Sequence, residues 1–396
     1  MKNIPLPAVA AIIALGLLAH PASAQSYSFQ DIGNLGGATI DGLGINASGQ
    51  VVGLASTAAG ANHAFLYDSN GIHDLGVFPG ASTGTTRFQP SSGAVGINAA
   101  GQIAGFSVST NRSQNAFLHT GSGMLTSSDD IGTPGTYSQG LAINDMGTVV
   151  GSASTSTGQH AFLYDGTMHD LGALRTTDSA TARGINSAGQ VVGISSDNTS
   201  TSGTSRAFRT SPGGAAINGA TDDLGTLGGS NAYAVAINGV GTVVGYSNTT
   251  NGAEHGFATP TGRGISAATD DLGVLPGYMD SYASGINSAG LIVGYNSKGV
   301  TTTGMDISPI ATLFTRGSWI DLNSFLPANS GYTLMFANSI NDAGQILVVG
   351  QNSSGMLHTF ILSPTPEPSS TAALGLGILG LAGLVFKARK RPASAA

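Results

Sequence analysis

Cysteine is absent from the 396-residue sequence, so the chain has neither disulfides nor thiol chemistry. Glutamate occurs only twice, at Glu254 and Glu367, and lysine is scarce. Because both residue types favour helices, a helical domain is hard to build from this composition. Glycine occurs 60 times, yet 41% of the residues are hydrophobic and they recur periodically, which favours a folded core over disorder.

An Ile-Asn pair recurs seven times along the chain, with steps of 52, 46, 42, 52, 49 and 54 residues between successive Asn residues. The pairs are Ile45-Asn46, Ile97-Asn98, Ile143-Asn144, Ile185-Asn186, Ile237-Asn238, Ile286-Asn287 and Ile340-Asn341. A period of this length indicates a repeat architecture. Each Asn begins an Asn-x-x-Gly sequence, which suits a type I turn, so we expect a structural role for the Asn rather than a ligand-binding one.

Each repeat contains four short apolar segments separated by Gly, Asn, Ser or Thr, which predicts strands joined by turns. In the fifth repeat they span residues 232–238, 241–247, 254–259 and 270–273. The second segment usually carries adjacent valines, such as Val51 and Val52, whose side chains must point to opposite, buried faces of a sheet. These features predict an all-β protein, a seven-bladed β-propeller with four strands per blade. A β-helix is the alternative, although its coils are shorter and more regular.

The two ends of the repeat region complement each other. A strand at residues 27–33 precedes any complete repeat, whereas the last repeat has strands at 336–341, 345–350 and 357–362 but no fourth. We therefore expect the N-terminal strand to complete the seventh blade, covering an edge that would otherwise be exposed.

The sequence divides into three regions. Residues 1–24 read as a secretory signal peptide, with Lys2, an apolar stretch at 8–19 and an Ala-x-Ala site at residues 22–24. Residues 25–363 form the propeller. Residues 364–396 form a tail in which an apolar run of 17 residues, 370–386, precedes the basic cluster 387–391, predicting one transmembrane helix with a cytoplasmic basic end.

The propeller region is acidic. Without the five basic residues and the one Glu of the two terminal regions, it keeps nine basic and twenty acidic residues, a net charge of −11. This charge favours solubility and argues against nucleic acid as a partner.

Propeller geometry places the connections between second and third strands, and between blades, on one face. The long segments 55–62, 78–90, 195–205 and 296–310 belong to that face, whereas tight turns are expected on the other. Because function concentrates on such loops, we expect a binding site there. The candidate ligand-binding residues are Arg87, Phe88, Tyr137, Tyr278, Asp280 and Tyr282. Tyr rings stack on sugar faces, but packing of Tyr278 and Tyr282 between blades is an equal alternative.

The sequence gives little support for a metal site or a catalytic site. Four His residues recur at one strand position in different blades, and the geometry separates them, so structural or surface roles are expected and no metal site is predicted. They are His63, His160, His255 and His358. Paired Asp residues at 129–130, 222–223 and 270–271 suit edge strands or turns, and Trp319 suits the core. No cofactor is expected, with Ca²⁺ in the acidic loops as the open alternative.

The tail resembles the PEP-CTERM sorting signal of Gram-negative bacteria. The resemblance rests on Pro366, Glu367 and Pro368, followed by the apolar segment and the basic cluster. It implies recognition and cleavage by an exosortase, a membrane-embedded processing enzyme, and an association with exopolysaccharide and biofilm.

The propeller region resembles the extracellular HAF-repeat family, named for His-Ala-Phe. The phrase is intact at residues 63–65 and 160–162 and altered at 115–117, 206–208, 255–257 and 358–360. This resemblance implies no reaction.

We therefore predict a non-enzymatic protein that is exported through the inner membrane, anchored transiently by its C-terminal helix, and then displayed or released by an exosortase. Extracellular polysaccharide is its expected partner. Two alternatives stay open: a hydrolase or lyase acting on extracellular glycan from the long-loop face, and a purely structural surface protein without a specific ligand.

Overall fold

The computed structural model describes residues 26–79, 91–108, 114–199, 203–214, 216–299 and 305–365. The predicted signal peptide, the sorting motif Pro366–Pro368 and the predicted membrane helix lie outside these residues. The chain divides into a ring unit, Phe29–Ser363, and a unit formed by the two chain ends. In the second unit the N–H of Thr365 donates to the C=O of Ser26 at 2.9 Å.

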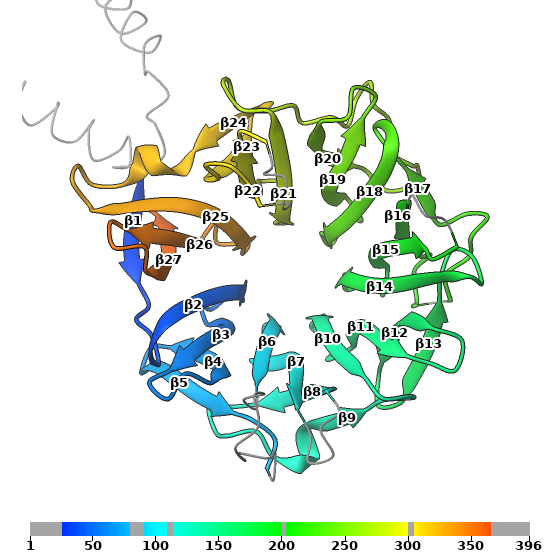
Figure 1. Cartoon of the computed structure of the whole chain (residues 1–396), viewed down its shortest axis with the longest axis horizontal. Coiled ribbons are helices and arrows are strands. Elements are labelled where there is room, and N and C mark those ends of the chain that lie inside the picture. The colour runs from blue at the N-terminus through cyan, green and yellow to red at the C-terminus, as the bar shows by residue number, and fades with distance from the viewer. Residues whose placement is uncertain are drawn as a thin grey trace, which may run out of the picture. The chain divides into compact units, whose positions relative to one another are not determined.

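The described strands form seven antiparallel sheets arranged as blades around an axis, which confirms the predicted seven-bladed β-propeller (Figure 1). Blade 1 contains β2 (Gly36–Ile45), β3 (Val51–Thr57), β4 (Asn62–Asp68) and β5 (Gly71–Gly76). Blade 2 contains β6 (Ser92–Ile97), β7 (Gln102–Val108), β8 (Gln114–Thr120), the 3-10 helix η1 (Ser127–Asp129) and β9 (Asp130–Gly132). Blade 3 contains β10 (Ser138–Ile143), β11 (Val149–Ser154), β12 (Gln159–Tyr164) and β13 (Met168–Gly172).

The remaining blades follow the same order, with the first strand of each lying nearest the axis in Figure 1. Blade 4 contains β14 (Asp178–Ile185), β15 (Val191–Asp197), β16 (Ser205–Arg209) and β17 (Asp223–Gly225). Blade 5 contains β18 (Gly228–Ile237), β19 (Val243–Thr249) and β20 (Glu254–Thr259), and its fourth strand is reduced to a bridge between Phe257 and Asp271. Blade 6 contains β21 (Asp280–Ile286), β22 (Ile292–Ser297), β23 (Ile310–Thr315), β24 (Ser318–Asp321) and the 3-10 helix η2 (Leu322–Phe325). Blade 7 contains β25 (Tyr332–Ile340), β26 (Ile346–Asn352), β27 (Leu357–Pro364) and, as its fourth strand, β1 (Tyr27–Asp31).

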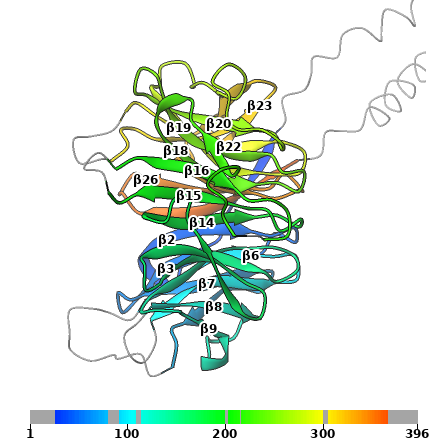
Figure 2. The ribbon, with the colours of Figure 1, turned by 90° about the vertical axis from the view of Figure 1, so that its right-hand side faces the viewer.

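The hydrophobic core lies between the blades. Val51 packs in a cluster with Leu347 and Ile361 of blade 7, while its neighbour Val52 packs with Ala94 of blade 2. Adjacent residues of one strand thus face opposite neighbours, as their sequence predicted. The third strand adds one fully buried ring in each of six blades: Phe65, Phe117, Phe162, Phe208, Phe257 and Phe360. Figure 2 shows the ring unit edge-on, as a disc that is wider than it is thick.

A glycine follows the paired valines because the backbone of the first strand comes unusually close there. The pairing of β2 with β3 shifts register between Gly42 and Gly44, which marks a bulge. A Cβ atom on Gly53 would lie 2.0 Å from the carbonyl oxygen of Asp41. Only glycine fits this approach without moving the backbone.

The repeated Asn closes its own turn, as predicted. In each blade the N–H of the fourth turn residue donates to the carbonyl of the Asn, for example Gly101 to Asn98 at 3.0 Å. The Asn side chain also links the blades: Asn98 Nδ2 donates to the carbonyl of Asn144 at 3.0 Å. The same bond recurs at all seven positions, and Asn341 Nδ2 donates to the carbonyl of Asn46 at 2.8 Å. The seven bonds form a closed circle, a role that the turn chemistry alone did not predict.

The repeated His also has a structural role. His63 Nδ1 lies 2.8 Å from Asp74 on the neighbouring outer strand, and equivalent pairs join His160 to Asp170 and His255 to Asp271. Each of these Asp residues also accepts the N–H of the glycine two residues later, as Asp74 does from Gly76 at 2.7 Å. The position therefore contributes to the hydrogen bonding that holds the blade together.

Blade 7 closes the ring by the predicted arrangement of three C-terminal strands and one N-terminal strand. The ring of Phe29 stacks on Phe360 with centroids 4.3 Å apart. Asp31 accepts from His358 Nδ1 at 2.8 Å, which repeats across the chain ends the pair found within other blades. The two ends of the repeat region are thus tied together by the same contacts that build each blade.

The distribution of long loops differs from the prediction. Tight turns were expected between third and fourth strands, but long connections occur there at 121–129, 210–222 and 260–270. The Asp pairs were predicted in edge strands or turns, and a turn role of their first member explains two of these loops. Asp222 and Asp270 are buried, and each accepts the N–H of the residue four positions earlier, Asn218 or Ser266. Both faces of the ring therefore carry extended loops.

Candidate functional site

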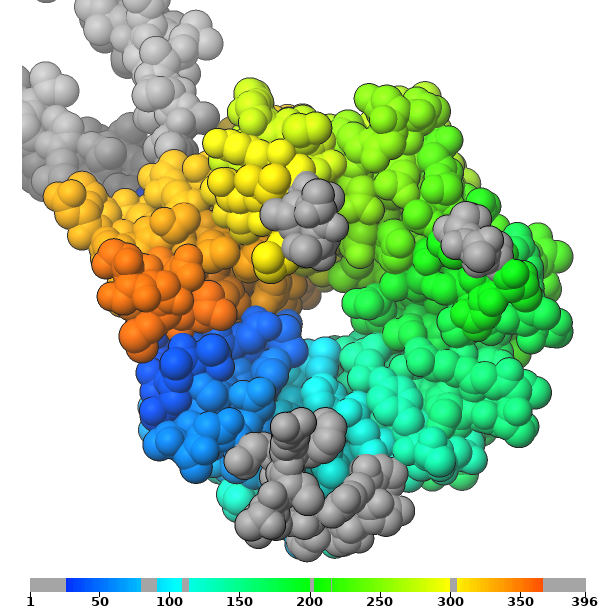
Figure 3. All heavy atoms as spheres, in the orientation of Figure 1, coloured from blue at the N-terminus to red at the C-terminus, as the bar shows by residue number. Residues whose placement is uncertain are grey.

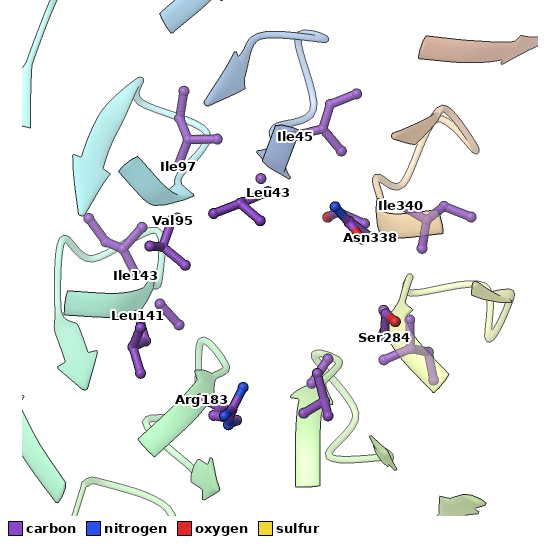
Figure 4. A pocket seen from close by; sticks show the side chains of 18 residues that line it. Leu43, Ile45, Val95, Ile97, Leu141, Ile143, Arg183, Ser284, Asn338 and Ile340 are labelled. Carbon is purple, nitrogen blue, oxygen red and sulfur yellow. The ribbon is translucent and has the colours of Figure 1, made fainter. Parts of the chain in front are cut away.

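The ring encloses a central cavity of about 440 Å³. Figure 3 shows the centre of the ring hollowed in the space-filling view. In every blade the residue two positions before the Ile of the Ile-Asn pair lines it, because this part of the first strand runs beside the axis (Figure 4). These axial residues are Leu43, Val95, Leu141, Arg183, Val235, Ser284 and Asn338.

The axial residues divide the cavity wall into unlike halves. Leu43, Val95 and Leu141 make the wall of blades 1 to 3 apolar, whereas Ser284 and Asn338 bring polar groups from blades 6 and 7. Arg183 on β14 is the one charged residue in the described lining, and it is exposed. Within the described residues its guanidinium has no ion-pair partner. The wall therefore offers an apolar side, a polar side and one free positive charge.

An array of aromatic rings crosses blades 5, 6 and 7 toward the face opposite the Asn turns. Tyr233 stacks on Tyr246 with centroids 4.7 Å apart, and Tyr282 stacks on Tyr295 at 4.4 Å. Edge contacts join Tyr246 to Tyr282 at 5.0 Å and Tyr295 to Phe336 at 4.9 Å. We call these five residues the tyrosine array. Tyr282 is buried, while the other four rings are partly exposed.

Carboxylates stand beside the tyrosine array. The hydroxyl of Tyr282 donates to Glu254 Oε2 at 2.8 Å. Burial raises the pKa of Glu254, the hydrogen bond from Tyr282 opposes this shift, and the charges of Asp280 and Asp306 add to it. Burial also raises the pKa of Tyr246 to about 12, although the positive charge of Arg183 acts in the opposite direction. Arg183 therefore lies near enough to Tyr246 for its charge to act on that pKa.

Asp41 is a further carboxyl group near the axis. It lies on β2, and its Oδ1 accepts from Asn338 Nδ2 at 3.0 Å across the junction of blades 1 and 7. Burial raises the pKa of Asp41 to about 6, although the bond from Asn338 opposes this shift. The carboxyl group is therefore part protonated in mildly acidic solution.

Only part of the predicted binding set joins this region. Tyr282 lies in the array, and its packing between blades 5 and 6 matches the alternative stated for it. Asp280 begins β21 and is buried, with its Oδ1 accepting from the N–H of Glu254 at 2.9 Å, so it links two blades. Tyr278 is half-buried before β21, with Lys298 Nζ 5.7 Å from its ring centroid.

Tyr137, the other predicted residue that the structure describes, lies in a different blade. Tyr137 is half-buried at the start of blade 3, and its N–H donates to Ser154 Oγ at 3.0 Å. Arg87 and Phe88 lie outside the described residues. Of the four predicted residues that the structure describes, Tyr278, Asp280 and Tyr282 thus lie together in blade 6, whereas Tyr137 lies in blade 3.

Sequence reasoning missed Arg183, Glu254 and four of the five rings of the array. A signal was present: the fifth and sixth repeats both carry Tyr four residues before the Ile of the Ile-Asn pair, and both carry Tyr after the Val-Gly of the second strand. Aligning the repeats on their Ile-Asn pairs would have exposed these shared tyrosines, and would have shown Arg183 as the one charged residue at its repeat position.

A second pocket of about 510 Å³ lies between the long loops of blades 4 and 5. Its two arginines are already engaged. Arg209 donates to the carbonyl groups of Gly241, Pro260 and Arg263, and Arg263 binds the buried carboxylate of Asp270. The pocket thus owes its shape to a structural network.

Two further findings concern metals and membranes. In the described part of the chain, no group of three or more His, Asp or Glu side chains could hold a metal ion. The same residues include no helix that is long and apolar enough to cross a membrane. The predicted membrane segment 370–386 lies outside them.

Comparison with known proteins identifies a sorting motif in the tail. Residues 364–391 match the family described as the PEP-CTERM protein-sorting motif. This match supports an exported protein that an exosortase processes and that reaches the cell surface or the extracellular space. A search of the curated proteins found no match.

Proposed function

We propose that this protein is a non-enzymatic binding module of the cell surface or extracellular matrix, and that it associates with extracellular polysaccharide. The sorting motif supports export and display, and the tyrosine array beside the central cavity carries the binding proposal. The array presents partly exposed rings from three successive blades on a rigid ring. Aromatic faces of this kind suit the apolar faces of sugar rings, while the phenol hydroxyls suit sugar hydroxyl groups.

The cavity supports the same proposal. Its volume lies within the range of small-molecule sites, and such sites combine apolar walls with a few placed polar groups. The described lining of the cavity carries no carboxylate. A pair of carboxylates is what glycoside hydrolysis ordinarily requires, so the cavity itself favours binding over catalysis.

The proposal also includes membership of the HAF-repeat family, which the propeller resembles, and an association with the biofilm of a Gram-negative bacterium.

The tail would anchor the chain in the inner membrane through residues 370–386 until exosortase cleavage. Mass measurement of the mature protein tests this step. We expect a chain that ends near Pro366, and a full-length C-terminus in cells lacking the exosortase; an uncleaved tail in normal cells contradicts it.

The binding test is calorimetric titration of the full-length protein, in neutral detergent, with the producing organism's own exopolysaccharide, with and without Ca²⁺. We expect saturable binding that Tyr246→Ala or Tyr295→Ala weakens at least tenfold and that the corresponding Phe substitutions largely retain. Tyr164→Ala, which removes a half-buried ring outside the array, serves as the matched control. Binding that is equally sensitive to Tyr164→Ala and to the array variants would count against the array.

The enzyme alternative keeps one specific observation in its favour. Glu254 has a raised pKa and bonds the Tyr282 hydroxyl, and Asp306 lies near enough to contribute to that shift. A glycan hydrolase or lyase would shorten the polymer during the titration, which size-exclusion chromatography detects, and Glu254→Gln would abolish the shortening. If the titration gives no heat of binding and the polymer is not shortened, the purely structural role is favoured.

A further inference from the structure

Arg183 differs from three arginines of the described ring that are held by structural contacts. Arg206 pairs with Asp223 at 3.0 Å, Arg263 pairs with Asp270, and Arg209 donates to three backbone carbonyls. Arg183 instead projects from β14 into the lining of the central cavity, exposed and without an ion-pair partner among the described residues. A guanidinium group placed in an otherwise uncharged wall, with no structural bond to make, is suited to a ligand.

We propose that the central cavity binds an acidic sugar residue and that Arg183 holds its carboxylate. This inference rests on the proposed polysaccharide-binding function and names the class of polymer. The planar guanidinium presents two parallel N–H donors that match a carboxylate, an arrangement stronger than a neutral hydrogen bond. A neutral polymer would leave this charge unused.

The remaining axial residues fit the rest of such a ligand. Leu43, Val95, Leu141 and Val235 offer aliphatic contacts to the C–H faces of a sugar ring. Ser284 of blade 6 offers a hydroxyl group to ring hydroxyls. Asn338 of blade 7 offers its amide oxygen, because its Nδ2 already donates to Asp41 Oδ1 and to the carbonyl of Gly42. A cavity of about 440 Å³ has room for one or two sugar residues.

The charge of the whole ring narrows the class further. A net charge of −11 repels a densely charged polyanion, so a single arginine suits isolated carboxylates and not a continuous phosphate backbone. The carboxylate of Glu254, beside the tyrosine array, is already bonded to the Tyr282 hydroxyl. A polymer with spaced uronic acid residues fits this charge distribution, because it presents one carboxylate at a time to Arg183.

The test compares two probes, digalacturonate and the neutral disaccharide cellobiose, by calorimetric titration of the full-length protein. We expect digalacturonate to bind more tightly than cellobiose, and Arg183→Gln to weaken its binding by about tenfold to a hundredfold, the loss of one charged hydrogen-bonding pair. Arg183→Lys should retain part of the affinity. Arg175→Gln, which removes the same charge from an exposed side chain outside the cavity, should change nothing. Equal melting temperatures of the variants show that folding is intact.

Three outcomes separate this inference from the proposed function. Digalacturonate binding that survives Arg183→Gln overturns the role of Arg183. Equal binding of both probes, with the organism's own polymer still bound by the tyrosine array, overturns the acidic class while the polysaccharide function stands. Failure of digalacturonate, cellobiose and the native polymer to bind overturns both.

Discussion

At each Asn of the repeated Ile-Asn pair, one amide group serves two backbone segments that are far apart in the chain. Asn98 Oδ1 accepts the N–H of Gln102 at 2.9 Å, which holds the turn, and Asn98 Nδ2 donates to the carbonyl of Asn144 in the next blade. The side chain is only 3% exposed, so neither half of the amide has water as a substitute partner. Each buried group left without a partner costs free energy of folding.

Substitution at Asn98 separates these two functions. Asn98→Ala is expected to lower the free energy of unfolding by about 2 to 4 kcal/mol, because several buried groups lose their partners. Asn98→Asp keeps the acceptor for the turn but places a carboxylate against the carbonyl of Asn144, so we expect a loss at least as large. Urea denaturation measures both. If Asn98→Asp is as stable as the native protein near neutral pH, the bond between blades contributes nothing.

The carboxyl group of Asp41 makes stability depend on pH. Its pKa is about 6 in the folded protein and lower in the unfolded chain, so the folded state binds the proton more tightly between these two values. Stability is therefore highest when the group is protonated, and it falls as the pH rises toward 6. Asp41→Asn removes this penalty and should stabilise the protein at pH 7 by about 2 kcal/mol. The amide oxygen can still accept from Asn338.

The same substitution has a built-in control. At pH 3.5 the carboxyl group is protonated in the folded protein and largely protonated in the unfolded chain, so the gain should nearly vanish. Thermal unfolding at pH 3.5 and pH 7 gives the comparison. An equal gain at both pH values would show that the effect comes from packing and not from the charge.

Residues whose roles are local could be predicted from the sequence, whereas those that act across the ring could not. The turn role of Asn98 follows from Asn-x-x-Gly alone, but its second partner is Asn144, in the next repeat. For Tyr282 the sequence left packing between blades as one of two alternatives, because its burial depends on Tyr246 and Glu254 of the preceding blade. Burial by a neighbouring blade depends on how the sheets stack, which local sequence does not encode.

At the scale of the strand pair, the Asp of the outer strand is more important than the His that it faces. Asp74 accepts from His63 and also from the N–H of Gly76, whose φ of +64° is readily adopted only by glycine. In other blades the His position holds Asn115, which donates to Asp130 at 2.8 Å, or Arg206, which pairs with Asp223. The donor thus varies while the acceptor is kept.

A pair of substitutions tests this difference. His63→Asn should change the free energy of unfolding by less than about 1 kcal/mol, because Asn115 shows that an amide fills the position. Asp74→Ala should cost about 1 to 2 kcal/mol, since it removes a turn bond as well as the strand pair. Urea denaturation midpoints measure both. A cost for His63→Asn as large as that for Asp74→Ala would reverse the assignment.

The strands of the blades could be predicted almost completely, because each is marked by short apolar segments and turn residues. The exceptions have physical reasons. The fourth strand of blade 5 shrinks to a bridge at Asp271, since the loop 260–270 before it is held by Asp270 and Arg263. Long loops between third and fourth strands were missed because loop length varies freely on either face of a rigid blade, and no turn motif reveals it.

At the scale of the whole molecule, the central cavity exists only because the ring closes. Successive axial residues lie about one repeat apart in the sequence. The sequence around each of them therefore gives no sign that Leu43, Arg183 and Asn338 line the same cavity. The number of blades followed from the number of Ile-Asn pairs. Predicting the chemistry of the cavity requires the repeats to be superposed and the ring to be closed.

Closure itself depends on β1. Its Phe29 ring stacks on Phe360, Asp31 accepts from His358, and the N–H of Ile32 donates to the carbonyl of Thr359 at 3.1 Å. Without this segment, β27 becomes an open edge with unpaired N–H and C=O groups. The protein lacking residues 26–33 is therefore expected to self-associate and to unfold at lower urea concentration than the complete chain.

A synthetic peptide covering residues 26–35 should reverse this defect, because an extended segment can add to an open sheet edge in trans. We expect the peptide to restore the monomer in size-exclusion chromatography and to raise the urea midpoint of the shortened protein. A peptide carrying Phe29→Ala and Asp31→Ala is the matched control, since it keeps the backbone bonds but loses the ring stacking and the partner of His358. If both peptides restore the monomer equally, closure depends on backbone pairing alone. If neither does, the N-terminal strand is not what completes the ring.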